Sequence, residues 1–141
     1  DALTYEDGTF DAILLDAPCS ATGTIRRHPD LPYVKSQTGI TDLVALQRAL
    51  LLRAFDLLKP DGALVYCTCS LLREEGEDQI KWLLAERPDT EVAKATAPGL
   101  EPHWISPDGG VRLRPDYWSD IGGMDGFYMA VLRNKGKASP A

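Results

Sequence analysis

Apolar residues near the start and in the middle of the chain form two short, uninterrupted runs. The first is Ala12 to Leu15, within FDAILLDAPC, and the second is ALVYCTC, from Ala63 to Cys69. Unbroken runs of this length, bounded by turn residues, are typical of parallel strands that are covered on both faces. The pattern therefore predicts a buried strand at each run.

Segments with helical periodicity follow both runs. Residues 41–58 are predicted to form a helix that starts at a threonine cap, because their apolar residues recur every three or four positions. Proline, aspartate and glycine at 60–62 predict a turn. Residues 73–86 predict a second helix, whose acidic start suits the helix dipole. Segment 20–39 contains several glycines and prolines and is expected to be a loop.

The last third of the chain carries weaker strand signals. Short strands are expected within 90–95 and 110–115, and a longer one at 125–134, whereas 135–141 is expected to be a disordered tail. Alternating strands and helices predict an α/β fold with a mostly parallel sheet. In such sheets ligands bind beyond the carboxyl ends of the strands, so the residues that follow each strand become the candidates for function.

Charge and hydropathy limit the classes of partner. The 141 residues carry a net charge of -6 and have a pI of about 4.8. Nucleic-acid-binding modules are usually basic, so the chain as a whole does not look like one. Arg26, Arg27 and His28 still form a local basic cluster, which is either a solvated loop or a site for a phosphate backbone. No apolar run approaches the roughly 20 residues that span a bilayer, and no signal peptide is visible, so a cytoplasmic protein without a membrane partner is expected.

Two of the three cysteines stand at the ends of the two predicted strands. Cys19 lies just beyond Asp16 and a proline, and Cys69 follows Thr68. Because consecutive parallel strands are usually neighbours, both thiols are expected to face the same ligand site. Cys67 lies two residues before Cys69 and would share its face if the strand continues that far. An odd, small number of cysteines argues against a disulfide framework.

Three other interpretations of the cysteines were weighed. Zinc is disfavoured because the C-x-C spacing and the two histidines, His28 and His103, do not match a zinc site, so no metal is expected. A redox dithiol is disfavoured because no C-x-x-C motif occurs. Buried cysteines that act as small apolar residues would explain Cys67 better than Cys19 or Cys69, which stand beside polar residues.

Three segments together resemble the Sun/Fmu-type (RsmB-like) RNA cytosine-5 methyltransferases. They are DAPCSATGTIRRHPD, LLKPDGALVYCTCSLLREEGE and RLRPDYWSDIGGMDGFYMAVLRN, and the resemblance extends over most of Phe10 to Asn134. It implies methyl transfer from S-adenosylmethionine to carbon 5 of a cytosine in RNA, with ribosomal RNA as the expected substrate. A transfer RNA substrate, and a non-catalytic methyltransferase-like module that binds RNA, remain alternatives.

The resemblance also implies roles for individual residues. Cys69 would attack carbon 6 of the cytosine, which makes carbon 5 nucleophilic, and Cys19 would help to release the methylated RNA. Asp16 would hydrogen-bond the cytosine ring. The spacing alone does not say which cysteine attacks. The remaining assignments that follow from the resemblance are Asp16 and Pro18 beside the cofactor, and Arg26, Arg27 and Thr68 on the RNA.

The family's glycine-rich cofactor loop does not occur in these residues. The resemblance therefore implies that 1–134 is the C-terminal part of a Rossmann-like catalytic domain, with its last strand antiparallel and set between its neighbours. Alone, this part is expected to be inactive, to bind S-adenosylmethionine weakly, and to self-associate through the free edge of its first strand. Gly76 replaces an asparagine that is common in the family, and glycine is expected to weaken the first turn of the helix there.

Overall fold

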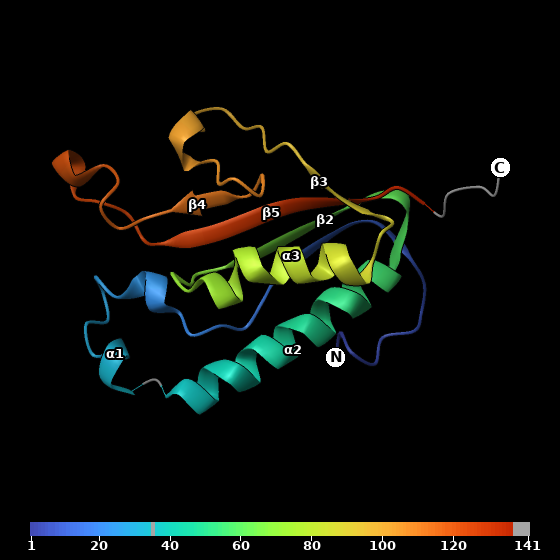
Figure 1. The fold of residues 1–141 in the computed structure, drawn as a ribbon, viewed down its shortest axis with the longest axis horizontal. Coiled ribbons are helices and arrows are strands. Elements are labelled where there is room, and N and C mark those ends of the chain that lie inside the picture. The colour runs from blue at the N-terminus through green and yellow to red at the C-terminus, as the bar shows by residue number, and fades with distance from the viewer. Residues whose placement is uncertain (35, 137–141) are drawn as a thin grey trace.

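A mixed five-stranded sheet carries two main helices on one face in the computed structural model, which describes residues 1–34 and 36–136 (Figure 1). The strands are β1 Phe10–Asp16, β2 Leu58–Thr68, β3 Thr90–Ala93, β4 Val111–Leu113 and β5 Phe127–Asn134. The helices are α1 Leu31–Val34, α2 Gln37–Asp56 and α3 Glu77–Glu86, with 3-10 turns at Thr22–Thr24, Arg73–Glu75, Pro102–Trp104 and Ser119–Ile121.

The direction of the strands agrees with the predicted fold class. The order along the sheet is β1-β2-β5-β3, and β4 also pairs with β5. β1 and β2 pair in parallel, whereas every pairing of β5 is antiparallel. Four strands therefore run in one direction. β5 runs in the other between β2 and β3, which confirms the predicted antiparallel insertion.

Both main helices begin at positions that differ from the predicted ones. α2 begins at Gln37 because Ser36 caps it, its hydroxyl accepting the Gly39 amide at 3.1 Å. Thr41, the predicted cap, lies inside the helix and donates to the Gln37 carbonyl. α3 begins only at Glu77, because the preceding residue has a non-helical backbone and 73–75 form a separate 3-10 turn.

The core lies between the sheet and the helices α2 and α3. Its fully buried members include Phe55 from α2, Leu83 from α3 and Tyr66 from β2. β1 contributes much less than expected: Ile13 and Leu15 pack against the core, whereas Leu14, which alternates with them along the strand, is 71% exposed. The prediction that this strand is buried on both faces was therefore wrong.

Smaller elements match the sequence more loosely. The predicted turn at 60–62 lies within β2, where Asp61 has a φ of 62° and the pairing with β1 shifts register. Of the predicted tail, Lys135 donates its amide to the Asp89 carbonyl at 2.9 Å, while 137–141 lie outside the described residues. Within the part of the chain that is described, no helix is long and apolar enough to cross a membrane.

Candidate active site

The carboxyl ends of β1 and β2 bring Cys19 and Cys69 together. The strands are in register there, with Asp16 opposite Cys67, and the Ala17 amide continues the pairing to the Cys67 carbonyl at 3.0 Å. Both strands therefore leave the sheet at the same level. The Cys19 and Cys69 sulfur atoms lie 3.5 Å apart, and both thiols are free and half-buried. The predicted juxtaposition is found.

Cys67 lies beneath this pair and is the most buried of the three thiols. It contacts the Leu15 carbonyl at 3.7 Å and the Asp16 carboxylate at 3.8 Å. Burial, followed by the charge of Asp16, raises the pKa of Cys67 to about 11. Cys67 therefore stays protonated at neutral pH and fits the structural role that the sequence favoured for it.

The Cys19 thiol is held in its protonated form. Burial raises the pKa of the Cys19 thiol, and the adjacent Cys69 and the charge of Glu75 raise it further. A thiol held in its protonated form is a poor nucleophile, because the thiolate is the attacking species. The surroundings of Cys19 therefore make it a poor nucleophile at neutral pH.

The loop after Cys19 is fastened to the loop that carries Cys69. The Gly23 amide donates to the Cys69 carbonyl at 2.9 Å, and the Gly126 amide donates to the Gly23 carbonyl at 2.8 Å. A Cβ atom on Gly23 would lie only 2.0 Å from the Gly126 oxygen and 2.8 Å from the Cys69 oxygen. Only glycine allows the two backbones to approach this closely.

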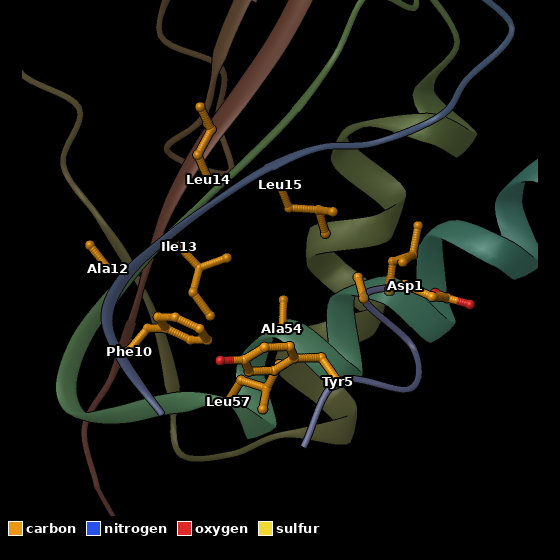
Figure 2. Close-up of a pocket in the computed structure, with 11 residues that line it drawn as sticks. Asp1, Tyr5, Phe10, Ala12, Ile13, Leu14, Leu15, Ala54 and Leu57 are labelled. Carbon is orange, nitrogen blue, oxygen red and sulfur yellow. The ribbon is translucent and has the colours of Figure 1, made fainter. Parts of the chain in front are cut away.

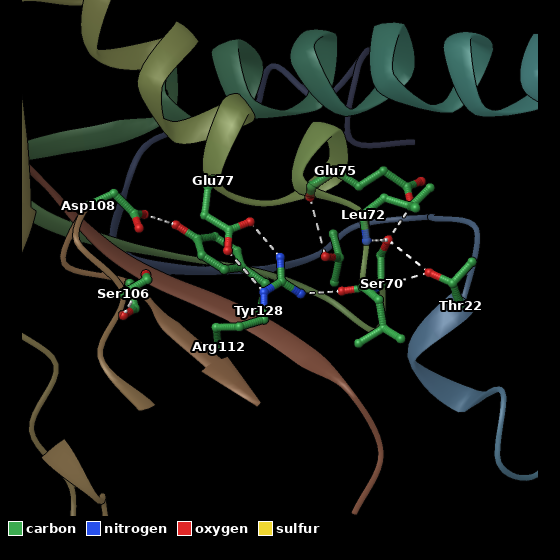
Figure 3. Close-up of polar contacts among 12 residues, drawn as sticks. Thr22, Ser70, Leu72, Glu75, Glu77, Ser106, Asp108, Arg112 and Tyr128 are labelled. Atoms are coloured by element: carbon green, nitrogen blue, oxygen red, sulfur yellow. Dashed lines mark hydrogen bonds and ion pairs between the residues drawn. The ribbon is translucent and has the colours of Figure 1, made fainter. Parts of the chain in front are cut away.

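A buried polar cluster, which we call the serine network, connects the same two loops (Figure 3). It consists of Ser20, Thr22, Ser70 and Glu75. The Thr22 hydroxyl accepts the Leu71 amide at 2.9 Å and lies 3.3 Å from the Ser70 hydroxyl. Two of its members directly follow the cysteines in the sequence. No pattern in the sequence indicates this network, because buried and exposed hydroxyls look alike in a sequence.

Arg112 of β4 supports the second cysteine loop from the side (Figure 3). It donates to the Ser70 carbonyl and forms a two-bonded ion pair with Glu77, largely shielded from solvent. Its guanidinium also stacks 5.0 Å from the centre of the Tyr128 ring. A Cβ atom on Gly76 would meet Arg112 at 2.7 Å and the Tyr128 ring at 2.9 Å. The packing therefore explains the glycine at position 76.

Arg26 and Arg27 share one partner. Both bind Asp125, with N–O distances of 2.7 Å in each pair, and both remain largely exposed. Hydrogen bonds and charge from Arg27, and then from Arg26, hold the pKa of the Asp125 carboxyl below its usual range. The basic cluster of the sequence is thus partly neutralised, while its guanidinium groups keep open faces.

The other residues with assigned roles lie at different depths. Asp16 and Pro18 are exposed at the end of β1, and the Pro18 carbonyl accepts the Gln47 side chain at 2.8 Å. Thr68 is fully buried, with its hydroxyl 3.3 Å from the Glu75 carbonyl, so the structure places it beneath the cysteines rather than on a surface open to RNA. Over the described ranges, no group of three metal-binding side chains gathers.

A hollow of about 400 Å³ lies beside β1, bounded by β1, the N-terminal segment and the second half of α2 (Figure 2). Its walls are mostly apolar and include Tyr5, Phe10, Leu14 and Leu57. None of the cysteines lines it. The hollow therefore belongs to the free edge of the sheet and not to the thiol pair.

Comparison with known proteins connects this geometry to one family. The family described as 16S rRNA methyltransferase RsmB/F matches residues 2–133. "Ribosomal RNA small subunit methyltransferase B" from Shewanella oneidensis is 44% identical over 128 residues, which is 91% of this chain and 28% of that protein. The protein of the same name from Sodalis glossinidius is 52% identical over 95 residues, which is 65% of this chain and 22% of that protein.

Solved structures agree with the sequence relatives. NSun6 from Pyrococcus horikoshii, crystallised with SFG, superposes with a TM-score of 0.79 at 29% identity, covering 97% of this chain and 34% of that one. A methyltransferase homologue from the same organism gives a TM-score of 0.69 at 34% identity, covering 91% of this chain and 40% of that one. The chain thus spans between about a fifth and two fifths of the length of these proteins. It belongs to the 16S rRNA methyltransferase RsmB/F family.

Proposed function

We propose that this chain is the cysteine-bearing part of a catalytic domain that methylates carbon 5 of a cytosine in small-subunit ribosomal RNA. The observation that carries the proposal is the pair of free thiols 3.5 Å apart where two parallel strands leave the sheet. Membership of the family and the names of the sequence relatives support the substrate class. Because the chain covers only a part of those relatives, the activity is proposed for the full-length protein.

Cys69 is the nucleophile in this proposal. Its thiolate adds to carbon 6 of the cytosine, and the electron pair displaced from the ring makes carbon 5 nucleophilic toward the methyl group. A base then takes the proton from carbon 5, the bond between sulfur and carbon 6 breaks, and the ring regains its double bond. Cys69 leaves as the thiolate that entered the reaction.

Cys19 assists the departure of Cys69. Burial keeps Cys19 protonated, and its sulfur lies 3.5 Å from that of Cys69, within range of a sulfur hydrogen bond. Its S–H can therefore donate to the sulfur that gains charge when the adduct breaks down. A hydrogen bond to a developing anion strengthens as the charge appears, which favours release of the methylated RNA.

Asp16 provides the carboxylate of the site. Asp16 is exposed at the end of β1, and the only hydrogen bond to its carboxylate within the described residues is the weak one from the Cys67 thiol. The free acceptor capacity suits the amino group of cytosine and the protonated ring nitrogen of the adduct. Its negative charge also suits a sulfonium cofactor, so Asp16 and the exposed Pro18 fit positions beside S-adenosylmethionine, which supplies the methyl group when bound.

Arg26 and Arg27 are the proposed contacts to the RNA backbone. Both guanidinium groups lie on the loop that follows Cys19 and remain about half exposed, with 44% and 53% of the side-chain surface accessible. Arginine binds phosphate through several parallel hydrogen bonds. Asp125 holds both side chains on the same side of the loop, which presents them together to a single strand.

The test uses the full-length protein and a ribosomal RNA fragment with 5-fluorocytosine at the target position. Fluorine cannot leave carbon 5 as a proton does, so the bond between protein and RNA persists and survives a denaturing gel. We expect wild-type protein to form this adduct and Cys69→Ser to form none. Cys67→Ser is the matched control, because it alters a thiol two residues away that stays protonated, and it should retain the adduct.

Two outcomes would contradict the proposal. If the wild-type protein forms no adduct with any cytosine of small-subunit ribosomal RNA, the proposed activity fails. If Cys19→Ser abolishes the adduct and Cys69→Ser keeps it, the roles of the two thiols are reversed. With ordinary RNA, Cys19→Ser should instead accumulate the adduct, because release of the product is impaired.

A further inference from the structure

Glu75 is a fully buried carboxylate that touches both cysteine-bearing loops. Figure 3 shows its contact with Ser70. One of its oxygens accepts the Ser20 hydroxyl at 2.6 Å and the Ser70 hydroxyl at 2.5 Å. The other accepts the Ser20 amide at 2.9 Å. Ser20 directly follows Cys19, and Ser70 directly follows Cys69. A single side chain therefore spans the two loops at the same relative position in each.

The rest of the fold holds Glu75 in place. Its second oxygen also accepts the Gln47 amide at 3.1 Å, and the same amide reaches the Pro18 carbonyl at 2.8 Å. The main-chain carbonyl of Glu75 accepts the Tyr66 hydroxyl at 2.8 Å and that of Thr68 at 3.3 Å. Contacts from α2 and β2 thus hold Glu75 in addition to its contacts with the two loops.

The surroundings of Glu75 suit a group that accepts hydrogen bonds. Across residues 1–34 and 36–136, no basic side chain forms an ion pair with it, and its partners are all neutral donors. A carboxylate offers about four acceptor positions, which matches these donors. A glutamine there would turn its own N–H groups toward donors such as Ser20 or Gln47. Burying an unneeded charge is unfavourable, so this arrangement points to a use for the carboxylate.

We propose that Glu75 is a positioning residue, whose carboxylate holds the Cys19 and Cys69 thiols at the separation that the reaction requires. This inference rests on the proposed function for its purpose, although the positioning itself can be measured without catalysis. The charge of Glu75 also acts on Cys19, whose pKa it helps to raise after the larger effect of burial. Glu75 thus affects both the distance between the thiols and the protonation of one of them.

The first experiment measures how strongly the protein holds the two thiols together. The full-length protein is equilibrated at pH 7 with reduced and oxidised glutathione, and the Cys19–Cys69 disulfide is quantified by peptide mass spectrometry. Each disulfide formed in the protein converts one oxidised glutathione into two reduced molecules, so electrons and protons balance. We expect Glu75→Gln to lower the equilibrium constant by about tenfold, because the loops are no longer bound to one group.

The matched control is Glu74→Gln. Glu74 is the preceding residue and is exposed, so this substitution removes the same charge from the same turn without touching either loop. Its equilibrium constant should equal that of the wild type. Glu75→Ala should weaken the pairing further than Glu75→Gln, and if the alanine variant fails to fold, the glutamine variant carries the test alone.

Two further measurements separate positioning from general support of the fold. In Glu75→Gln, the midpoint for alkylation of Cys19 should move to lower pH, because the charge of Glu75 is one of the causes that raise the pKa of Cys19. An unchanged urea midpoint would show that the shift does not come from a loosened fold. In methyl transfer, kcat should fall by up to about 100-fold while KM for RNA is unchanged, because misplacement of reacting groups affects the chemical step.

The positioning proposal fails if Glu75→Gln leaves both the disulfide equilibrium and the alkylation profile of Cys19 at wild-type values. That result would not touch the proposed function, which is tested by the covalent adduct of Cys69. Conversely, the wild-type protein could form no adduct while Glu75→Gln still shows the expected shifts. The positioning role of Glu75 would then stand, and the proposed activity would fail.

Discussion

The backbone amide of Gly126 donates a hydrogen bond to the Gly23 carbonyl at 2.8 Å, which joins the loop after Cys19 to the start of β5. Gly23 in turn donates to the Cys69 carbonyl. The Cys19 loop, the Cys69 loop and the start of β5 therefore contact one another at Gly23, which has no side chain. These contacts set the position of the Cys19 loop.

Substitution Gly23→Ala is expected to destabilise the chain. The new methyl group would overlap the backbone of Gly126, which cannot move aside as a flexible side chain can. Overpacking of this kind lowers the free energy of unfolding by roughly 1–3 kcal/mol, measurable as a lower urea midpoint by circular dichroism. Gly39→Ala is the control, because its Cβ atom would approach only the Ser36 hydroxyl, at 3.2 Å, and alanine favours the helix. Equal midpoints for the two variants would contradict the prediction.

Asp125→Asn is expected to weaken the fold at neutral pH and to have little effect in acid. Arg27 and Arg26 lower the pKa of Asp125 in the folded state. Its contribution to stability is therefore complete above the unfolded value of about 4 and is lost as the pH falls through the lower folded value. Urea unfolding at several pH values should show wild type and variant converging at low pH. Asp120→Asn, at an exposed carboxylate, is the control. A difference in unfolding free energy between wild type and Asp125→Asn that grows as the pH falls would contradict the prediction.

Cys69 is expected to take up the first alkyl group when the folded chain is treated with iodoacetamide at pH 8. The pKa of Cys67 is raised to about 11, so about 0.1% of this thiol is ionised at that pH, and the pKa of Cys19 is also raised. Peptide mass spectrometry at increasing times gives the order of labelling. In urea the three thiols should react at similar rates, and early labelling of Cys67 in the folded chain would count against the burial described here.

Leu14→Lys is expected to reduce self-association of the 141-residue chain. β1 has a free edge, Leu14 is 71% exposed, and a charged residue on an edge strand opposes pairing with another chain. Light scattering over a range of concentrations measures the effect. Tyr33→Lys, which alters a side chain that is 89% exposed on α1, should leave the association unchanged. A wild-type chain that is monomeric at all concentrations would contradict this prediction.

The sheet was the most predictable part of the fold. Apolar runs marked β1, β2 and β5, and the alternation with helices indicated parallel strands. Burial was harder to predict: the run from Ala12 to Leu15 looks like a strand covered on both faces, yet only Ile13 and Leu15 pack against the core and Leu14 is exposed. Run length and composition report the preference for a strand and do not report which neighbours the strand has.

The residues at the strand ends could be predicted from the sequence, whereas those brought to the site by tertiary contacts could not. Strand ends located Cys19 and Cys69, but nothing local separates Glu74, Glu75 and Glu77. The structure leaves the first exposed, buries the second among serines and pairs the third with Arg112. Their different surroundings come from residues far away in the sequence, which no pattern of neighbouring residues contains.

β5 follows every other described strand in the sequence and yet occupies the interior of the sheet, between β2 and β3. Synthesis proceeds from the N-terminus at about 5–20 residues per second, so β2 emerges from the ribosome several seconds before the strand that completes its second edge. During that interval the edge of β2 is open to pairing with other nascent chains. Folding of the thiol-bearing end must therefore wait for the final strand, and a chaperone that shields β2 during translation would protect the site as it forms.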